Sequence, residues 1–415
     1  MLLSERTPGE IMTSRTSTAP KRWLTEVRLE GFKAAFKPQP IPLQPFNVVI
    51  GRNGSGKSTL IEALQWIDTA IRLDAREACS RYYGARDLVN FRSPDLHFEL
   101  ELTWGGGEAA EPSLRYLLKV DADEPTGAPS IRSEELVSLV GGAVRNVYLT
   151  GERIRALSAP NGKSAGPSVF FRDPDRLALG LLTSAGVGKP DQGLRALEDF
   201  WTNAVFLRLS PNRLSAGSLA TRRSFESLLD EEGRNLPALL NELSNRQRQH
   251  LVEALREVLP EVDAISVSGA EHGRDTIVNY GLVEKLSSRG RRGRRKFHVP
   301  SWMLSEGTRR ITAIMALLVR DPAPSLLCIE EIENGLDPWT VQAVLRHLQS
   351  AATRGTQVIL TTHSPWVLDY IPIDSILQVR RIEGDTRYEH FSSRPEIKAF
   401  DASVPAGTRY VNEAE

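Results

Sequence analysis

The stretch "VVIGRNGSGKSTL", residues 48–60, carries the strongest indication of the fold class. The apolar run "PFNVVI" leads into it, and its β-branched residues favour a buried parallel strand. The segment "STLIEALQWIDTAIRL" ends it, with apolar residues at helical spacing. The glycines therefore lie between a strand and a helix, which is the context that a phosphate-binding loop requires. The pattern G-x-x-x-x-G-K-S in this context predicts a nucleotide site.

The positions of this loop differ in what they contribute to phosphate binding. Gly51 and Gly56 occupy the fixed glycine positions, and Gly54 adds a residue free to adopt positive φ. Backbone N–H groups and the helix N-terminus can then cradle phosphates. Lys57 is predicted to reach the β- and γ-phosphates of ATP, and Ser58 to ligate Mg²⁺. The predicted ATP-binding residues of the loop are Gly51, Asn53, Gly54, Ser55, Gly56, Lys57, Ser58 and Thr59.

Two further apolar strands end in residues that can bind a metal ion or take part in catalysis. The first, in "PSLLCIEEIENGLDP" (324–338), ends in Glu330 and Glu331. Glu330 can hold the Mg²⁺ shell, and Glu331 can orient or deprotonate an attacking water. The second, in "TQVILTTHSPWVLD" (356–369), ends at His363. Taken singly, each segment has a structural alternative. The first can be a buried strand followed by an acidic turn, and the second can end in a histidine that only packs.

A helix begins within "WMLSEGTRRITAIMALLVR" (302–320), where Ser305 taken alone would be an ordinary N-cap. Together and in this order, the four elements resemble the ATP-binding-cassette (ABC) class of P-loop ATPases. The matched segments are Walker A (Gly51 to Thr59), the signature (Leu304 to Gly307), Walker B (Leu326 to Glu331), the D-loop (Gly335 to Asp337) and the switch histidine, His363.

The long segment between Lys57 and Ser305 indicates which branch of the ABC class the chain resembles. It contains short strands and helices rather than sustained heptads, which disfavours a condensin-like arm. The opening "LTEVRLEGFKAAF" (24–36) is similar to RecF-like and OLD-like ATPases. The chain looks like their compact bacterial subgroup of predicted AAA-type ATPases, which is commonly linked to anti-phage defence, over roughly residues 23 to 385. Fewer than about 55 residues follow His363, too few for the Toprim nuclease domain of OLD proteins.

The resemblance implies an α/β fold, a P-loop NTPase of the ABC-ATPase type with a long inserted α/β lobe. We expect a flexible N-terminal tail over 1–22, the ATPase domain over 23–390 with the inserted lobe at about 105–299, and a C-terminal tail over 391–415. Proteins of this class also use a glutamine at a strand end, for which Asn90 in "DLVNFRS" is the substitute candidate.

The family also implies a mechanism with ATP and Mg²⁺ as cofactors. The signature acts across a twofold interface, so a homodimer is the expected active form. Ser305 and Gly307 would contact the γ-phosphate held by the partner, and Asp337 would bridge the protomers. Glu331 would polarise the water in cis, while His363 would contact the γ-phosphate. We expect such a dimer to serve a separately encoded effector.

The charge composition of the chain limits how it can bind nucleic acid. The chain has 52 basic and 52 acidic residues, so any nucleic-acid contact must come from a local patch. One dense basic run, "RGRRGRRK", can contact DNA phosphates, and a solvated hairpin loop is its alternative. A stand-alone RecF-like DNA-binding ATPase is therefore the rival hypothesis. The basic residues of the run are Arg289, Arg291, Arg292, Arg294, Arg295 and Lys296.

Three remaining features bear on the interface, on membranes and on the cellular compartment. Arg309 and Arg310 follow the signature, and either one faces the partner's nucleotide or both are surface helix cations. No apolar run is long enough to span a membrane, and the N-terminus lacks the apolar core of a signal peptide. The two cysteines, Cys79 and Cys328, form no disulfide framework, which favours a cytoplasmic protein.

Overall fold

The structure is a computed structural model. It describes residues 22–105, 113–122, 126–140, 143–150, 153–156, 169–170, 175–180, 192–220, 227–272, 275–286 and 295–413. The predicted N-terminal tail, 1–22, lies outside these ranges except for Arg22. In the part of the chain so described, no helix combines the length and apolar character needed to cross a membrane.

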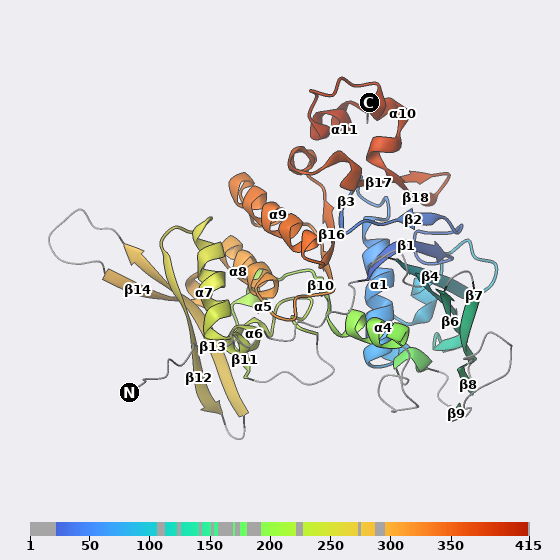
Figure 1. Cartoon of the computed structure of the whole chain (residues 1–415), viewed down its shortest axis with the longest axis horizontal. Coiled ribbons are helices and arrows are strands. Elements are labelled where there is room, and N and C mark those ends of the chain that lie inside the picture. Colours follow the sequence, from blue (N-terminus) through green and yellow to red (C-terminus); the bar gives the residue numbers. More distant parts are fainter. Residues whose placement is uncertain are drawn as a thin grey trace, which may run out of the picture.

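A six-stranded sheet at the centre of the molecule carries the nucleotide-binding elements (Figure 1). Five neighbouring strands are parallel and the last, at the β18 edge, is antiparallel. Four of the parallel strands are buried along their whole length, as a sheet covered on both faces requires. The strand order is β10 (Ala204–Leu207), β15 (Leu326–Ile329), β16 (Gln357–Thr362), β3 (Phe46–Gly51), β17 (Ile376–Ile382) and β18 (Asp385–His390).

Strand β3 shows how the two faces of this sheet are filled. Val49 belongs to the hydrophobic core that contains the residues of the first long helix, α1 (Lys57–Arg72). Val48 and Ile50 belong to the core on the other face, with residues of α8 (Glu306–Leu318) and α9 (Pro338–Thr353). Alternate side chains of one strand thus anchor the phosphate-loop helix on one face and the signature helix on the other.

An eight-stranded antiparallel sheet packs over the α1 side. Its first strands are joined to the central sheet by Gln357, whose side chain accepts from Leu24 N (2.8 Å) and donates to Leu24 O (2.7 Å). The strand order is β2 (Pro40–Pro42), β1 (Trp23–Glu30), β4 (His97–Gly105), β5 (Ser113–Ala122), β6 (Pro129–Val140), β7 (Ala143–Thr150), β8 (Arg153–Ala156) and β9 (Val169–Phe170). The helices α2 (Ala75–Cys79), η1 (Ala85–Leu88) and α4 (Gln192–Thr202) accompany this part of the chain.

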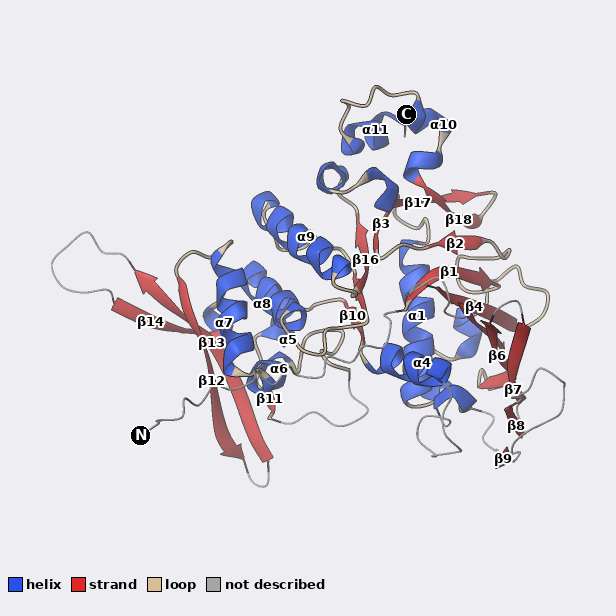
Figure 2. Ribbon diagram, viewed as in Figure 1, coloured by secondary structure: helices blue, strands red, loops and turns tan. Residues whose placement is uncertain are grey.

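A third, separate sheet lies on the far side of the signature helix, where the strands stand at the left edge of Figure 2. Its strands are β11 (Ser218–Leu219), β12 (Val262–His272), β13 (Asp275–Leu286) and β14 (Arg295–Pro300), and its helices are α5 (Pro211–Leu214), α6 (Leu236–Glu242) and α7 (Asn245–Arg256). The segment predicted as one inserted lobe, about 105–299, is therefore divided. Its strands extend the eight-stranded sheet, supply β10 to the central sheet, and build this third sheet.

The segment 391–413, predicted as part of a C-terminal tail, is folded. Phe391 and Ile397 are buried in the same core as α8 and α9, and Gly407 N donates to Asp369 Oδ1 at 2.7 Å. Local periodicity missed this segment because its elements are single turns or two turns long. They are η5 (Phe391–Ser393), α10 (Pro395–Lys398) and α11 (Ala406–Glu413), which follow η3 (Pro365–Tyr370) and η4 (Ile373–Ser375).

Candidate nucleotide site

The phosphate loop joins β3 to α1 as the sequence predicts. Gly54 has φ 74° and Gly56, the residue before the helix, has φ 104°, so both positions require glycine's freedom. The Lys57 ammonium folds back over the loop and donates to Gly51 O (2.8 Å) and Arg52 O (3.0 Å). Burial lowers the pKa of Lys57. The loop thus holds a buried cation that donates to two backbone carbonyls and interacts electrostatically with Glu331 and Glu333, and an anionic phosphate would be a stronger partner.

The other loop residues surround the same turn. Thr59 N donates to Gly56 O at 3.0 Å and begins the helical ladder. Asn53 is exposed at the tip of the loop. Ser55 is buried, and its hydroxyl has no hydrogen-bond partner in the described part of the protein. A buried hydroxyl without a partner is costly, and a bound phosphate oxygen would satisfy it.

Walker A and Walker B meet directly. Ser58 Oγ donates to Glu330 Oε2 at 2.8 Å, although 272 positions separate the two residues. Burial raises the pKa of Glu330, because its charge is held in a poorly solvated place. A hydroxyl and a carboxylate at the strand edge beside the phosphate loop are the ligands that Mg²⁺ takes together with phosphate oxygens. These residues therefore fit the ion that the sequence implies.

Glu331 and His363 form the second predicted pair. His363 Nε2 lies 3.2 Å from Glu331 Oε1, so the ends of β15 and β16 bring them together. Glu331 adopts a left-handed backbone, with φ 51°, which is uncommon for a glutamate. Its N–H donates to Thr361 Oγ1 at 3.0 Å. Non-glycine residues in this conformation cluster at functional sites, where the surrounding contacts maintain them.

The structure adds residues to this pair that the sequence analysis missed. The Asn334 amide donates to Glu331 Oε2, and Glu333 Oε1 accepts from His363 N at 2.7 Å. Thr361 holds the Glu331 backbone from the neighbouring strand. Glu333 and Asn334 lie in the acidic segment 324–338 that the sequence analysis singled out. Their positions two and three residues after Glu331 were the signal by which they could have been found. Thr361 carried none, because only strand pairing brings it near.

The signature and the D-loop lie against each other in the same chain. Ser305 is exposed and caps α8, accepting from Thr308 N at 3.1 Å. A Cβ added at Gly307 would lie 2.7 Å from Gly335 O, so this contact requires glycine. Asp337 caps α9, and its bonds from Thr340 lower the pKa of the carboxyl. The two predicted trans-acting elements therefore form one surface.

Exposed aromatic and apolar side chains border this surface. Trp302 (62% exposed) and Met303 (70%) belong to η2 (Ser301–Met303), immediately before the signature. Trp339 (79% exposed) belongs to the first turn of α9, directly after the D-loop. Large apolar side chains so exposed beside two functional motifs are typical of an interaction surface.

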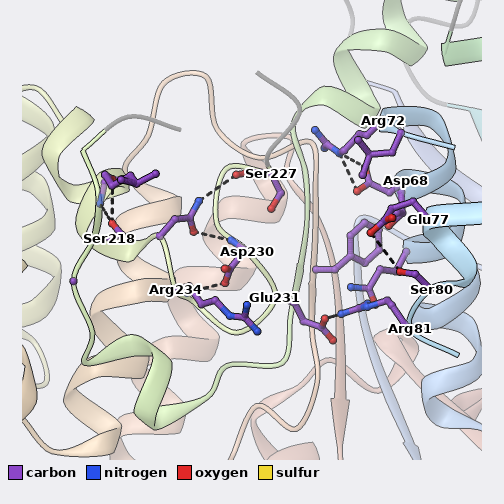
Figure 3. A pocket seen from close by; sticks show the side chains of 18 residues that line it. Asp68, Arg72, Glu77, Ser80, Arg81, Ser218, Ser227, Asp230, Glu231 and Arg234 are labelled. Atoms are coloured by element: carbon purple, nitrogen blue, oxygen red, sulfur yellow. Dashed lines mark hydrogen bonds and ion pairs between the residues drawn. The ribbon is translucent and has the colours of Figure 1, made fainter. Parts of the chain in front are cut away.

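A polar cavity of about 810 Å³ opens beside the carboxylates, and Glu330, Glu331, Arg310 and Arg208 line it. A second cavity of about 650 Å³ lies between α1 and the loop that precedes α6 (Figure 3). Arg81 and Glu231 form an ion pair across it, and both residues line both cavities. In Figure 3 the α1 and α2 wall carries Asp68, Arg72, Glu77 and Ser80, opposite Ser218, Ser227, Asp230 and Arg234.

Two secondary predictions concern Arg310 and Asn90. Arg310 is neither a surface cation nor turned to a partner, because it is 3% exposed and donates to Glu331 O of its own chain at 3.1 Å. Asn90 is buried in a loop, where its amide donates to Lys33 O and its carbonyl accepts from Arg92 N. Asn90 thus supports the turn after β1.

Most of the basic run lies outside the described residues, namely Arg289, Arg291, Arg292 and Arg294. The predicted hairpin that carries it is present, since Arg295 begins β14 and pairs with Leu286 of β13. Lys296 forms an ion pair with Asp263 at 2.8 Å, and Lys285 reaches the same carboxylate. Lys296 therefore already has an acidic partner.

Two family models match parts of the chain. The model described as "AAA domain, putative AbiEii toxin, Type IV TA system" matches residues 201–369, and the model described as "AAA domain" matches residues 26–100. The first range contains the signature, Walker B and the switch histidine, and the second contains the phosphate loop.

Two curated proteins are distantly similar. The "Chromosome partition protein Smc" of Rhodopseudomonas palustris is 25% identical over 181 residues, which are 42% of this chain and only 14% of that protein. The "Retron Vc95 probable ATPase" of Vibrio cholerae is 20% identical over 393 residues, which are 81% of this chain and 69% of that protein.

Solved structures of SMC heads also align with the chain. An SMC head bound to the C-winged helix domain of ScpA has a TM-score of 0.48 at 14% identity and covers 88% of this chain and 97% of that one. The SMC head domain from Thermotoga maritima has a TM-score of 0.42 at 15% identity, with coverages of 88% and 98%.

The sheet order, the motif geometry and the two family matches agree on the fold class. The chain has the α/β fold of a P-loop NTPase of the ABC-ATPase type, as the sequence predicts. Every Walker motif stands at the carboxyl edge of a parallel strand, which is where open α/β sheets bind their ligands.

Proposed function

We propose that this protein binds ATP with Mg²⁺ and hydrolyses it to ADP and phosphate. The observation that carries the proposal is the convergence of Ser58, Glu330, Glu331 and His363 at one edge of the central sheet. Ser58 and Glu330 would hold Mg²⁺, which neutralises phosphate charge when bound. Lys57 would exchange its backbone carbonyls for phosphate oxygens.

The chain's own residues divide the rest of the work. Glu331 Oε1 would accept a hydrogen bond from the attacking water and hold its proton. His363 would contact the γ-phosphate, and Asn334 and Thr361 would fix the Glu331 side chain and backbone. Such pre-set geometry is what phosphoryl transfer chiefly needs from a protein, since positioning and electrostatics dominate its catalysis.

The active form that we propose is a head-to-tail homodimer with ATP at the interface. Ser305, Gly307 and Asp337 share a surface that exposed Trp302, Met303 and Trp339 border. A second copy related by a twofold axis would cover these apolar side chains and bring Ser305 to the partner's γ-phosphate. ATP would then hold the dimer together, and hydrolysis would release it.

We further propose that the protein belongs to the RecF/OLD-like branch and drives a separately encoded effector in anti-phage defence. Support comes from the similarity to a retron ATPase over most of both chains, and from the match of residues 201–369 to the family described as "AAA domain, putative AbiEii toxin, Type IV TA system". A cytoplasmic location is part of this proposal. The rival is a stand-alone RecF-like ATPase that binds duplex DNA through the hairpin of β13 and β14.

One experiment tests the activity and separates the two roles. Steady-state ATP hydrolysis by the purified chain would be measured with and without duplex DNA, beside Glu331→Gln as the blank. Hydrolysis that exceeds the blank and ignores DNA supports the effector hypothesis. Stimulation by DNA that fades with salt favours the rival. No hydrolysis by the wild-type chain above a protein-free control, with ATP and Mg²⁺ saturating, rejects ATPase activity.

A further inference from the structure

The signature helix carries a buried arginine that is directed into its own chain. Arg310 stands one helical turn after Glu306 and is 3% exposed. Its guanidinium donates to Leu209 O at 3.3 Å and to Glu331 O at 3.1 Å. One side chain of α8 therefore contacts both the end of β10 and the turn that carries the water-activating glutamate.

The two carbonyls that it contacts are not equivalent. Leu209 belongs to the chain leaving the central sheet after β10 and is buried. Glu331 is the residue with the left-handed backbone, φ 51°. Its N–H is held from β16 by Thr361 and its carbonyl is held from α8 by Arg310. The uncommon conformation is thus fixed at both ends by groups from two different elements.

The same helix end also contacts the D-loop. A Cβ at Gly335 would lie 2.8 Å from the Glu306 carboxyl carbon, so the first turn of α8 packs directly on that loop. Arg310 lies on this side of the helix, near the carboxylates of Glu306, Glu331 and Glu333. Packing and hydrogen bonds therefore connect the helix end that carries Ser305 and Arg310 to the turn from Glu331 to Gly335.

We infer that Arg310 is a positioning residue that sets the catalytic turn of Glu331 according to the state of the signature helix. The inference rests on the proposed ATPase function. A partner nucleotide bound at Ser305 would fix the first turn of α8, and Arg310 would then fix the Glu331 carbonyl. Hydrolysis in one site would thereby depend on contact made at the other site.

The contact needs the chemistry of arginine. A guanidinium reaches two carbonyls at once from a planar fork, whereas a lysine ammonium is a point charge on a flexible stem. Its buried Nε has no partner among the described residues, so the side chain does not satisfy itself in full. An unsatisfied buried polar group costs free energy of folding, and in this protein the same side chain fixes the Glu331 turn.

The test compares Arg310→Met and Arg310→Lys with a matched control, Arg320→Met. Arg320 follows the far end of the same helix and pairs with Glu242 at 2.9 Å, away from the catalytic turn. We expect Arg310→Met to lower kcat about 100-fold while KM for ATP changes little, because misplacing a catalytic group costs rate rather than binding. Arg310→Lys should retain more rate, and Arg320→Met should keep wild-type kcat.

A double-mutant cycle distinguishes positioning from a merely structural role. In the Glu331→Gln background, the residual rate should be insensitive to Arg310→Met if Arg310 acts through Glu331. Equal losses in both backgrounds, or an Arg310→Lys variant with wild-type kcat, would overturn the inference. If Arg310→Met does not fold, Arg310→Lys carries the same cycle. Wild-type chain without hydrolysis would instead reject the proposed function itself.

Discussion

Ser58 and Glu330 are joined by a hydrogen bond of 2.8 Å between side chains that lie 272 positions apart. The bond crosses one intervening strand, β16, because Ser58 lies in the first turn of the helix after β3 and Glu330 directly follows β15. It places a hydroxyl and a partly buried carboxylate beside the phosphate loop. The predictions below follow from this edge of the sheet and from the buried groups around it.

Replacing Lys57 by Ala should weaken ATP binding about 100-fold, equivalent to about 2.7 kcal/mol. Among the described residues, the buried ammonium donates to the carbonyls of Gly51 and Arg52, for which phosphate oxygens are the natural replacement. Calorimetric titration with ATP and Mg²⁺ measures the change. Lys398→Ala, at an exposed lysine of α10, is the control. Unchanged ATP affinity in Lys57→Ala would reject the phosphate-loop assignment.

Glu331→Gln should lower kcat at least about 100-fold, since general-base catalysis contributes that much or more. The amide keeps the shape of the side chain and the contact with Asn334 or His363 but cannot hold the water's proton. Bound ATP should then persist and hold two protomers together. Size-exclusion chromatography with light scattering, with and without ATP, measures the dimer. A variant that turns over at the wild-type rate contradicts the role given to Glu331.

Trp339→Ser should weaken the ATP-dependent dimer by about 2 kcal/mol or more, the loss typical of an interface tryptophan. The side chain is 79% exposed, so the monomer should keep its melting temperature. Sedimentation in the Glu331→Gln background measures the dimer. Tyr83→Ser is the matched control, because Tyr83 is fully exposed and stands beside η1, whose buried residues pack in the core of α1. Equal effects of both substitutions would argue against this surface.

A pH dependence of stability should come from Glu134 of β6. Its buried carboxyl accepts from Tyr116 Oη (2.8 Å), Ala178 N and Leu179 N, yet burial raises the pKa of Glu134 from 4.5 to about 7. The folded state therefore binds this proton more tightly than the unfolded state does. Stability should fall as pH rises between 4.5 and about 7, by ~3 kcal/mol at about 1.4 kcal/mol for each pKa unit.

Urea unfolding at several pH values, for wild type and Glu134→Gln, isolates this contribution. The neutral amide does not titrate, so the difference between the two proteins should change with pH over that window. The buried Asp68, whose pKa burial raises to about 6, adds a slope of the same sign to both proteins and cancels in the comparison. A difference that stays constant with pH would contradict the assignment to Glu134.

The motifs with strong local patterns were predictable, and those that depend on packing were not. The glycines at positions 54 and 56 indicate residues with positive φ, and the apolar run before Glu330 indicates a buried strand. Arg310 looked like any helix cation, since its burial depends on where α8 meets β10. The division of the segment 105–299 was equally hidden, because strand pairing between distant segments leaves no mark on local periodicity.

The place of β3 between β16 and β17 has a consequence for how the chain is made. The phosphate-loop strand emerges from the ribosome early, but both of its neighbours in the sheet lie beyond residue 356. A nascent chain therefore carries an unpaired apolar strand until these two later strands have been synthesised, a state that invites aggregation or chaperone capture. ATP binding would accordingly arise only after β16 and β17 have been synthesised, and a product terminated before them would lack it.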